Sequence, residues 1–536
     1  MPDVNSPVAG GPALSASDGV MPDWLSHRAA SVGSRLAAVV GTERWSFADL
    51  DRRVTRAARR LATLGVRPGD RVALLLTNGP DFVELVHAAS RLGAVVVPVN
   101  VRLAAAEVAW HLADVGARVL VFDGLTADSA EAALDSVSAR PGGVSGARNQ
   151  PGTGQAGAVF ARPELIPVHV MELSALREAE DVRLRQRIHL DSVHSILYTS
   201  GTTGRPKGAM LTYGNHWWNA VGSALNLGLH PEDRWLACLP LFHVGGLSIL
   251  LRGVIYGIPV VVHPRFDPEA VNRAIDEEGI TLVSVVSTML ARMLEARGPR
   301  PYPRSLRCVL VGGGPVPKPL LERCVELGVP VVQTYGLTEA ASQVTTLAPE
   351  HARRKLGSAG RPLLPVEVQI EANGQPAAPG QPGEILVRGP TVSPGYFGKP
   401  GATAQAMRGG WLHTGDLGYF DEEGYLYVLD RRDDLIVSGG ENIYPAEVEA
   451  VLLAHPAVEE AGVVGQPDPV WGQIPVAAVK PKDGCHVTEA ELIRFCLARL
   501  ARFKVPKRVF AVDALPRNAA GKLARRALQA SLLEKP

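Results

Sequence analysis

The sequence predicts an α/β protein with a large N-terminal domain of doubly wound parallel sheets, a small β subdomain and a small α+β C-terminal domain. Three observations predict this architecture. β-branched runs alternate with segments of helical spacing in the first third of the chain and again around its middle. The chain has 536 residues, 46% of them hydrophobic, which is too long for one compact domain. After Pro365 the alternation gives way to short strands separated by glycine turns.

The first alternation is the clearest. Strand-like runs cover residues 71–76, 94–99 and 117–122, and segments with helical spacing cover residues 80–92 and 104–115. Pro80 stands where a helix can begin, since a proline at the first helical position loses no hydrogen bond. Such alternation predicts βαβ units and a mostly parallel sheet with helices on both faces.

The same rhythm returns later in the chain. Strand-like runs are expected at residues 257–262, 281–286 and 308–311, with a helix at 271–278. Between them and the first units, residues 138–157 are rich in Gly, Ala, Ser and Pro, which predicts a mobile loop.

The last third predicts two smaller units. Short strands at residues 366–370 and 384–388 indicate a β subdomain over residues 366–430. Beyond it, helices at 447–453 and 489–500 and strands at 460–466 and 474–480 indicate an α+β domain. The predicted divisions are a disordered extension over residues 1–20, an N-terminal domain over 21–430 and a C-terminal domain over 431–536.

Charge and composition exclude several classes of partner. The formal net charge is +1, so no basic field would hold nucleic acid, and no apolar stretch is long enough to span a membrane. No secretory signal is recognised at the N-terminus, and the five cysteines form no C-x-x-C pair. These features predict a cytoplasmic protein in a reducing compartment. They leave the oligomeric state open, including a homo-oligomer.

The most informative segment runs Tyr198-Thr-Ser-Gly-Thr-Thr-Gly-Arg-Pro-Lys-Gly208. It follows an apolar run at residues 193–197 and precedes a segment that can be helical. Its glycines allow backbone N–H groups to approach an anion, and its hydroxyls and lysine add further donors, so it predicts a phosphate-binding loop. The order of a Walker A loop is absent. The candidate phosphate ligands are Thr199, Ser200, Gly201, Thr202, Thr203, Gly204 and Lys207.

This loop resembles the signature of the adenylate-forming superfamily, which includes acyl- and aryl-CoA ligases, carrier-protein adenylation domains and luciferases. The resemblance implies an enzyme that joins a carboxylic acid to the AMP part of ATP and releases pyrophosphate. In the CoA ligases the acyl group then passes to coenzyme A. The expected small molecules are therefore ATP with Mg²⁺, a carboxylic acid and coenzyme A.

The segment Gln333-Thr-Tyr-Gly-Leu-Thr-Glu339 is similar to a second motif of the superfamily. The resemblance implies that Tyr335 stacks on adenine, that Thr338 contacts the α-phosphate and that Glu339 holds Mg²⁺. A carboxylate suits this hard cation because it prefers oxygen ligands. Upstream, Gly313 and Gly314 stand where similar loops lie along adenine.

Two further motifs carry the ribose contacts and the hinge. Trp411-Leu-His-Thr-Gly-Asp416 resembles the segment whose aspartate binds both ribose hydroxyls. In the segment 430–442 the resemblance assigns Arg431 to the ribose, Asp433 to the hinge of a mobile C-terminal domain, and Gly439 and Gly440 to the pantetheine tunnel.

Lys522, in Leu515-Pro-Arg-Asn-Ala-Ala-Gly-Lys522, matches the catalytic lysine of the superfamily. Its ammonium would bridge the incoming carboxylate and the α-phosphate, where negative charge grows in the transition state. Lys207 would help to neutralise the departing pyrophosphate. The C-terminal domain would then rotate, withdraw Lys522 and admit the thiol.

Substrate choice is expected in and after the apolar segment 239–248. His243 matches a position that gates the acyl pocket. The segments 240–256, 283–290 and 333–365 resemble the o-succinylbenzoate–CoA ligases of menaquinone biosynthesis. Their substrate has a second carboxylate, which needs a polar anchor in an apolar pocket. The candidate anchors are Ser248, Arg252, Ser287 and Thr288.

Other functions share part of this pattern. A medium-chain or aryl acid CoA ligase would have every ATP motif and differ only in the acyl pocket. A luciferase-like oxygenase has the same fold, and a non-catalytic homologue would be expected to lack Lys522, Glu339 or Asp416. A carrier-protein adenylation module would need a carrier domain, for which the sequence after Lys522 has no room.

Overall fold

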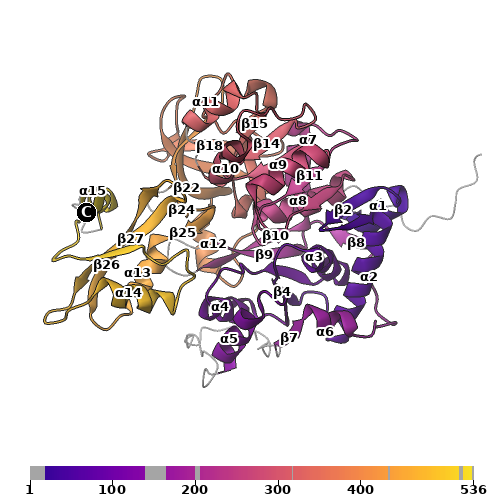
Figure 1. Cartoon of the computed structure of the whole chain (residues 1–536), viewed down its shortest axis with the longest axis horizontal. Helices are drawn as coiled ribbons and strands as arrows, with labels where there is room; N and C mark the ends of the chain where they lie inside the picture. The colour runs from indigo at the N-terminus through magenta and orange to yellow at the C-terminus, as the bar shows by residue number, and fades with distance from the viewer. Residues whose placement is uncertain are drawn as a thin grey trace, which may run out of the picture.

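The computed structural model describes residues 19–138, 165–199, 206–314, 316, 318–431, 435–517 and 523–533. Two large sheets form the centre of the N-terminal domain (Figure 1). Their parallel strands with helical crossovers confirm the predicted α/β class.

The first large sheet has six strands in the order β10-β9-β5-β4-β6-β7. The pairs β4–β5, β4–β6, β5–β9 and β6–β7 are parallel, and β10 pairs antiparallel with β9. In sheet order the strands are Lys207–Thr212, Val193–Thr199, Val95–Pro98, Arg71–Leu75, Val119–Phe122 and Ile166–His169.

Strand β10 corrects one expectation, because the phosphate-binding loop is followed by a strand rather than directly by a helix. Helix α7 (Tyr213–Leu227) begins only after β10, with the side chain of Thr212 accepting a hydrogen bond from Asn215 N. Pairing with β9 explains the difference: it gives the segment a partner that local propensity does not show.

The second large sheet has nine strands in the order β17-β16-β15-β14-β13-β11-β12-β2-β3, parallel from β15 to β2. The strands are, in that order, Arg361–Pro362, Ser342–Thr346, Val331–Leu337, Cys308–Val311, Leu282–Val285, Trp235–Ala237, Val260–Val262, Leu36–Val40 and Glu43–Ser46.

Helices between the two sheets join them through one hydrophobic core. Val86 of α3 (Pro80–Leu92) and Leu247 of α8 (Val244–Tyr256) belong to the same buried cluster. Helix α3 begins at Pro80 and ends at Gly93, whose φ of 76° closes the helix in the left-handed region. Helix α4 (Ala105–Val115) covers the first sheet beside β6 and ends in the same way at Gly116.

A smaller antiparallel sheet forms the predicted β subdomain. Its strands are β18 (Glu367–Ala372), β19 (Gln375–Pro376), β20 (Gly383–Arg388), β21 (Met407–Arg408), β22 (Trp411–Phe420) and β23 (Leu426–Arg431). Strand β22 brings Asp416 to the edge of the second large sheet, where its carboxylate meets Tyr335 of β15.

The described residues 435–533 form a separate α+β layer, called the C-terminal domain below and drawn in yellow in Figure 1. Its five strands are β24 (Ile436–Ser438), β25 (Glu441–Ile443), β26 (Val458–Asp468), β27 (Gly472–Pro481) and β28 (Arg508–Ala511). Its helices are α13 (Pro445–Leu453), α14 (Glu489–Leu497) and α15 (Arg525–Leu533). The division near residues 431–433 falls partly outside the described residues and stays a prediction.

The start of the chain needs a second correction. Strand β1 (Val20–Pro22) pairs with β8 (Arg187–His189), so the predicted disordered extension of residues 1–20 is too long at its end. Residues 1–18 and all of the predicted mobile loop at 138–157 except Ser138, which ends helix α5 (Ala127–Ser138), lie outside the described residues. Within the described ranges, no helix is both long and apolar enough to cross a membrane.

Candidate active site

A cavity of about 370 Å³ opens where both large sheets, the β subdomain and the C-terminal domain meet. The carboxyl ends of β9 and β14 point into it, which is the usual place for ligands in open α/β sheets. Predicted site residues that line it are Thr199, Gly313, Thr338, Glu339, Asp416, His243, Arg252, Gly439 and Gly440. The structure thus brings together residues that are far apart in the sequence.

Hydrogen bonds fix one of the two carboxylate oxygens of Glu339. Its Oε1 accepts a hydrogen bond from the hydroxyl of Tyr396 at 2.9 Å and another from Thr199 at 3.2 Å, and the described residues offer its Oε2 no partner. Burial and the nearby Glu339 charge raise the pKa of Tyr396, so this hydroxyl keeps its proton. Glu339 lines the cavity, so a carboxylate with one oxygen left over is available there, and carboxylate oxygens are ligands that a hard cation such as Mg²⁺ prefers.

Tyr335 and Asp416 are linked directly. The tyrosine hydroxyl donates to Asp416 Oδ2 at 2.7 Å, and the backbone N–H of Asp416 donates to the Thr414 hydroxyl at 3.0 Å. Asp416 lines the cavity, while Tyr335 is buried behind it. The residues predicted for adenine and for ribose are therefore neighbours with one shared hydrogen bond.

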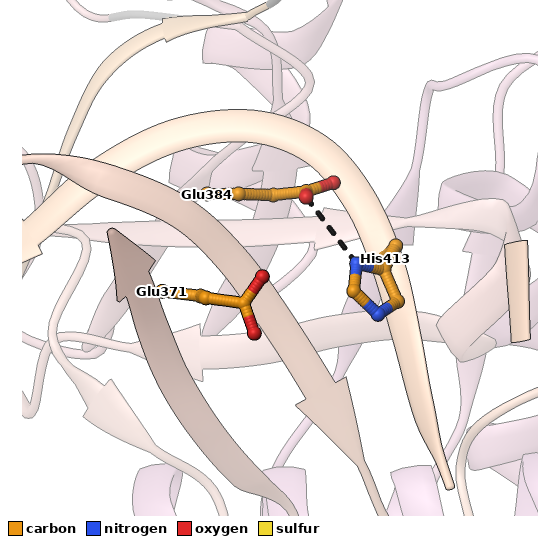
Figure 2. A group of neighbouring side chains, drawn as sticks. All are labelled: Glu371, Glu384 and His413. Atoms are coloured by element: carbon orange, nitrogen blue, oxygen red, sulfur yellow. Dashed lines mark hydrogen bonds and ion pairs between the residues drawn. The ribbon is translucent and has the colours of Figure 1, made fainter. Parts of the chain in front are cut away.

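A histidine and two glutamates gather beside this region on the β subdomain, as Figure 2 shows. His413 Nδ1 lies 3.2 Å from Glu384 Oε2 and 2.9 Å from Arg408 Nη2, and Glu371 faces Glu384 across β18 and β20. The guanidinium of Arg408 contacts the same imidazole as Glu384, so a positive charge lies near this pair. Contacts among these residues therefore explain why their side chains lie together.

Arg252 is a buried cation on the wall of the cavity. Its side chain is 2% exposed, its Nη2 donates to Asn219 Oδ1 at 2.6 Å, and its guanidinium lies 5.5 Å from the ring centre of Trp235. Its Nε has no hydrogen-bond partner, and no carboxylate of the described residues pairs with it. Burial lowers the pKa of Arg252, because no carboxylate of the described residues offsets the cost of burying its charge.

The other three predicted anchors lie differently. Ser248 donates to Gly245 O at 3.1 Å within helix α8, and neither it nor Ser287 or Thr288 lines the cavity. Ser284 and Gln343 do line it, although the sequence did not single them out. Of the four predicted anchors, Arg252 is the one that reaches the cavity.

The C-terminal domain closes the cavity through Glu441. Its carboxylate accepts hydrogen bonds from Arg102 Nη1 at 2.8 Å and Asn100 Nδ2 at 3.1 Å, and His243 Nε2 lies 3.1 Å away. Burial opposes the charge of Glu441, but His243 and Arg102 hold its pKa below the usual value. Glu441 is therefore an anion in contact with three groups of the N-terminal domain.

The two glycines before Glu441 fit the narrow side of the cavity. Gly439 and Gly440 have φ of 58° and 86°, and a Cβ at Gly439 would lie 2.7 Å from the ring of Trp471. A Cβ at Gly440 would approach Val286 of the N-terminal domain to 3.4 Å. Both positions need the absence of a side chain.

Several predicted residues fall elsewhere. Lys207 begins β10 with its ammonium 5.3 Å from the ring centre of Tyr396, and Gly314 does not line the cavity. The described residues do not include Ser200, Gly201, Thr202, Thr203, Gly204, Asp433, Lys522 or the side chain of Arg431.

Sequence reasoning also missed functional contacts. Tyr396 had no signal apart from a Pro-Gly turn before it, and Arg102 had none. Glu441 stands beside the two predicted glycines, so its place in that motif was the signal that could have found it.

Two family profiles match this chain. The AMP-binding enzyme family matches residues 25–397, and the AMP-binding enzyme C-terminal domain matches residues 447–522. The chain belongs to the AMP-binding enzyme family. The second match ends at Lys522, the residue predicted from the resemblance to be catalytic.

Within this family, the chain is 52% identical over 512 residues to 2-succinylbenzoate–CoA ligase of Geobacillus kaustophilus, covering 95% of this chain and 97% of that protein. Two structures of o-succinylbenzoate CoA synthetase from Bacillus subtilis are 44% identical and cover 95% of this chain. The double mutant bound to the product analogue OSB-NCoA has a TM-score of 0.87 and 99% of its chain is covered. The complex with the acyl-adenylate OSB-AMP has a TM-score of 0.71 and 98% is covered.

The two TM-scores differ although the sequence identity is the same. Over the matched length, this structure therefore superposes better on the product-analogue complex than on the acyl-adenylate complex.

Proposed function

We propose that this protein ligates 2-succinylbenzoate to coenzyme A with ATP, releasing AMP and pyrophosphate. A carboxylate oxygen of the acid attacks the α-phosphorus of ATP, and the bond from that phosphorus to pyrophosphate breaks. The sulfur of coenzyme A, with its proton lost, then attacks the acyl carbon, and the bond to AMP breaks. Identity of 52% to a 2-succinylbenzoate–CoA ligase over nearly the whole chain supports the reaction class.

The residues of the cavity suit the first step. Glu339 would hold Mg²⁺ with the oxygen that Tyr396 and Thr199 do not contact, and these two residues orient its carboxylate. The ion would neutralise charge on the phosphates of ATP. Asp416 would accept hydrogen bonds from the ribose, and Lys522 is proposed to stabilise the charge that grows around the α-phosphorus.

The observation that carries the choice of acid is Arg252. A buried guanidinium without a carboxylate partner is costly for an empty protein, because burial disfavours its charge. A substrate with a second carboxylate would supply the missing counter-ion. Monocarboxylic acids such as octanoate and benzoate would not, which separates this function from a fatty or aryl acid CoA ligase.

The test is a pyrophosphate-release assay with ATP, Mg²⁺ and coenzyme A in which 2-succinylbenzoate is compared with benzoate and octanoate. We expect a strong preference for 2-succinylbenzoate and a CoA thioester as product. Arg252→Met should lower kcat/KM for 2-succinylbenzoate about ten- to a hundredfold, the scale of a lost charged hydrogen bond, and change that for benzoate far less.

The matched control is Arg292→Met, which removes an exposed arginine that lies over Phe266 outside the cavity. It should leave both values unchanged. Preference for another acid would refute the choice of substrate. An equal loss for all acids in Arg252→Met would show that Arg252 acts on the fold and not on the second carboxylate.

A further inference from the structure

A short segment of the C-terminal domain, residues 500–505, docks on helix α4 of the N-terminal domain. Ala501 is buried within the hydrophobic cluster that contains Val108 of α4. Phe503 packs against this cluster and also against the core of its own domain. The contact is therefore formed from apolar surface on both sides, with polar groups at its centre.

Glu107 is the polar centre on the side of α4. Its Oε2 accepts hydrogen bonds from the N–H of Ala104 at 2.8 Å and from the N–H of Ala501 at 2.7 Å. Its Oε1 accepts a hydrogen bond from Lys504 Nζ at 2.6 Å. The bond to Ala104 belongs to the helix itself and fixes the carboxylate at the helix N-terminus. Glu107 is thus positioned before the other domain arrives.

Lys504 is the partner on the C-terminal side, and it is only 3% exposed. Its Nζ also donates to Glu447 Oε1 of its own domain at 2.8 Å. Burial opposes its charge, but Glu447 and Glu107 together raise the pKa of Lys504. The ammonium therefore keeps one carboxylate partner, Glu447, when the C-terminal domain moves away from α4.

This ion triad suits a contact that forms and breaks. Two carboxylates that are largely shielded from water share one ammonium, and the described residues offer Glu447 Oε2 no hydrogen-bond partner. Desolvation therefore cancels much of the attraction, as it does in buried ion pairs generally. Such a contact selects one geometry without holding it irreversibly.

We propose that Glu107 is a positioning residue for thioester formation, because it docks Lys504 and Ala501 in the domain arrangement described here. This arrangement agrees better with the product-analogue complex than with the acyl-adenylate complex. The inference rests on the proposed function, since it assigns the contact to the second of its two steps. Glu107 does not line the cavity, so it acts on the arrangement of the domains and not on the reacting atoms.

The kinetic test measures the two half-reactions separately in Glu107→Gln. The amide oxygen of Gln still caps α4, but the negative charge is lost. Thioester formation from preformed acyl-adenylate and coenzyme A should slow about tenfold or more, the scale of a lost hydrogen bond to a charged group. Pyrophosphate release in the absence of coenzyme A should change less than about twofold, a shift within the usual effect of an independent site.

The matched control is Glu84→Gln. Glu84 Oε1 accepts from Arg53 Nε at 2.6 Å in a partly buried ion pair that lies entirely within the N-terminal domain. It removes the same charge from a helix but touches no residue of the C-terminal domain. Both half-reactions should stay at the wild-type rate in this variant.

A second readout does not depend on the acid. Cys485 is the exposed cysteine of the chain and lies in the C-terminal domain, whereas the other four are buried. Fluorophores on Cys485 and on Glu131→Cys, an exposed position of helix α5 (Ala127–Ser138), report the separation of the domains by energy transfer. Glu107→Gln should reduce the population with the separation of the docked arrangement, and Glu84→Gln should not.

An equal loss in both half-reactions, or an unchanged rate of thioester formation, would overturn the proposal. So would an unchanged energy-transfer distribution in Glu107→Gln. If the wild type does not adenylate 2-succinylbenzoate, the proposed function fails, and the energy-transfer measurement still decides the role of Glu107.

Discussion

The two sides of the cavity bind their carboxylates in different ways. On the N-terminal side, Glu339 and Asp416 accept hydrogen bonds from the hydroxyls of Tyr396 and Tyr335, all within one domain. On the other side, Glu441 is buried in the C-terminal domain, and its partners are Arg102, Asn100 and His243 of the N-terminal domain.

The difference between contacts within one domain and contacts between two domains indicates which groups can act in both steps of the reaction. Neutral tyrosine donors within one domain hold their carboxylates in any position of the C-terminal domain. Contacts between charged groups of two domains exist only while the domains are docked, and their strength depends on exclusion of water. We therefore propose that the N-terminal side keeps its contacts through both steps, and that the C-terminal side is assembled for one step.

Lys522→Ala should have the largest effect on the reaction rate, and it tests whether the two half-reactions depend on different residues. Adenylation should slow by about two or more orders of magnitude, because a fixed cation at the developing charge is lost. Thioester formation from preformed acyl-adenylate should suffer far less. The measurement is single-turnover chemical quench of each half-reaction, and equal losses in both would contradict the assignment.

Asp416→Asn tests the N-terminal side. Loss of the charged acceptor should raise the KM for ATP about ten- to a hundredfold, the scale of hydrogen bonds to an ionised group. Tyr335→Phe removes only the hydroxyl that donates to Asp416 and should have a smaller effect of the same kind. Steady-state kinetics at varied ATP measures both. A larger effect of Tyr335→Phe than of Asp416→Asn would contradict the proposed role of the Asp416 carboxylate in binding the ribose.

The pH dependence of stability tests the contacts that Glu441 makes with the N-terminal domain. The pKa of Glu441 lies below its ordinary value of 4.5, so its stabilising contribution is present above that pH and is lost as the pH falls through the folded pKa. Thermal unfolding of the wild type and Glu441→Gln should therefore differ at pH 7, and the difference in Tm should shrink below pH 4.5. A difference that grows on acidification would show that Glu441 is not ionised in the folded protein.

Tyr396→Phe should have the smallest effect. Glu339 would lose one neutral hydrogen bond, so the Mg²⁺ concentration for half-maximal adenylation should rise only several-fold, corresponding to about 1 kcal/mol. A titration of pyrophosphate release with Mg²⁺ measures this change. No dependence on Tyr396 would mean that Thr199 alone orients the carboxylate.

Much of the fold could be predicted from local signals in the sequence. Helix α3 was predicted at residues 80–92, where the structure has it, because its helical spacing, initial proline and following glycine agree. Strand β10 was missed because its pairing with β9 across the phosphate-binding loop, and not its composition, makes it a strand.

The site could be predicted where residues lie in compact motifs. Thr338, Glu339 and Asp416 line one cavity, as the resemblance implied. The contacts of Glu441 could not be predicted, since its partners Asn100 and Arg102 are 341 and 339 residues away. Ser287 and Thr288, which the sequence offers as polar anchors, stand at the start of α10 (Ser287–Arg297) and do not line the cavity.

The most direct test of the division between the two sides compares Lys522→Ala with Glu441→Gln in a rapid-quench experiment with 2-succinylbenzoate, ATP and coenzyme A. Acyl-adenylate and CoA thioester are measured in the same time course. We expect opposite effects: Lys522→Ala delays the appearance of acyl-adenylate, whereas Glu441→Gln lets acyl-adenylate accumulate and slows its conversion to thioester. If both variants slow the same half-reaction, the proposed division between the N-terminal and C-terminal sides of the cavity is wrong.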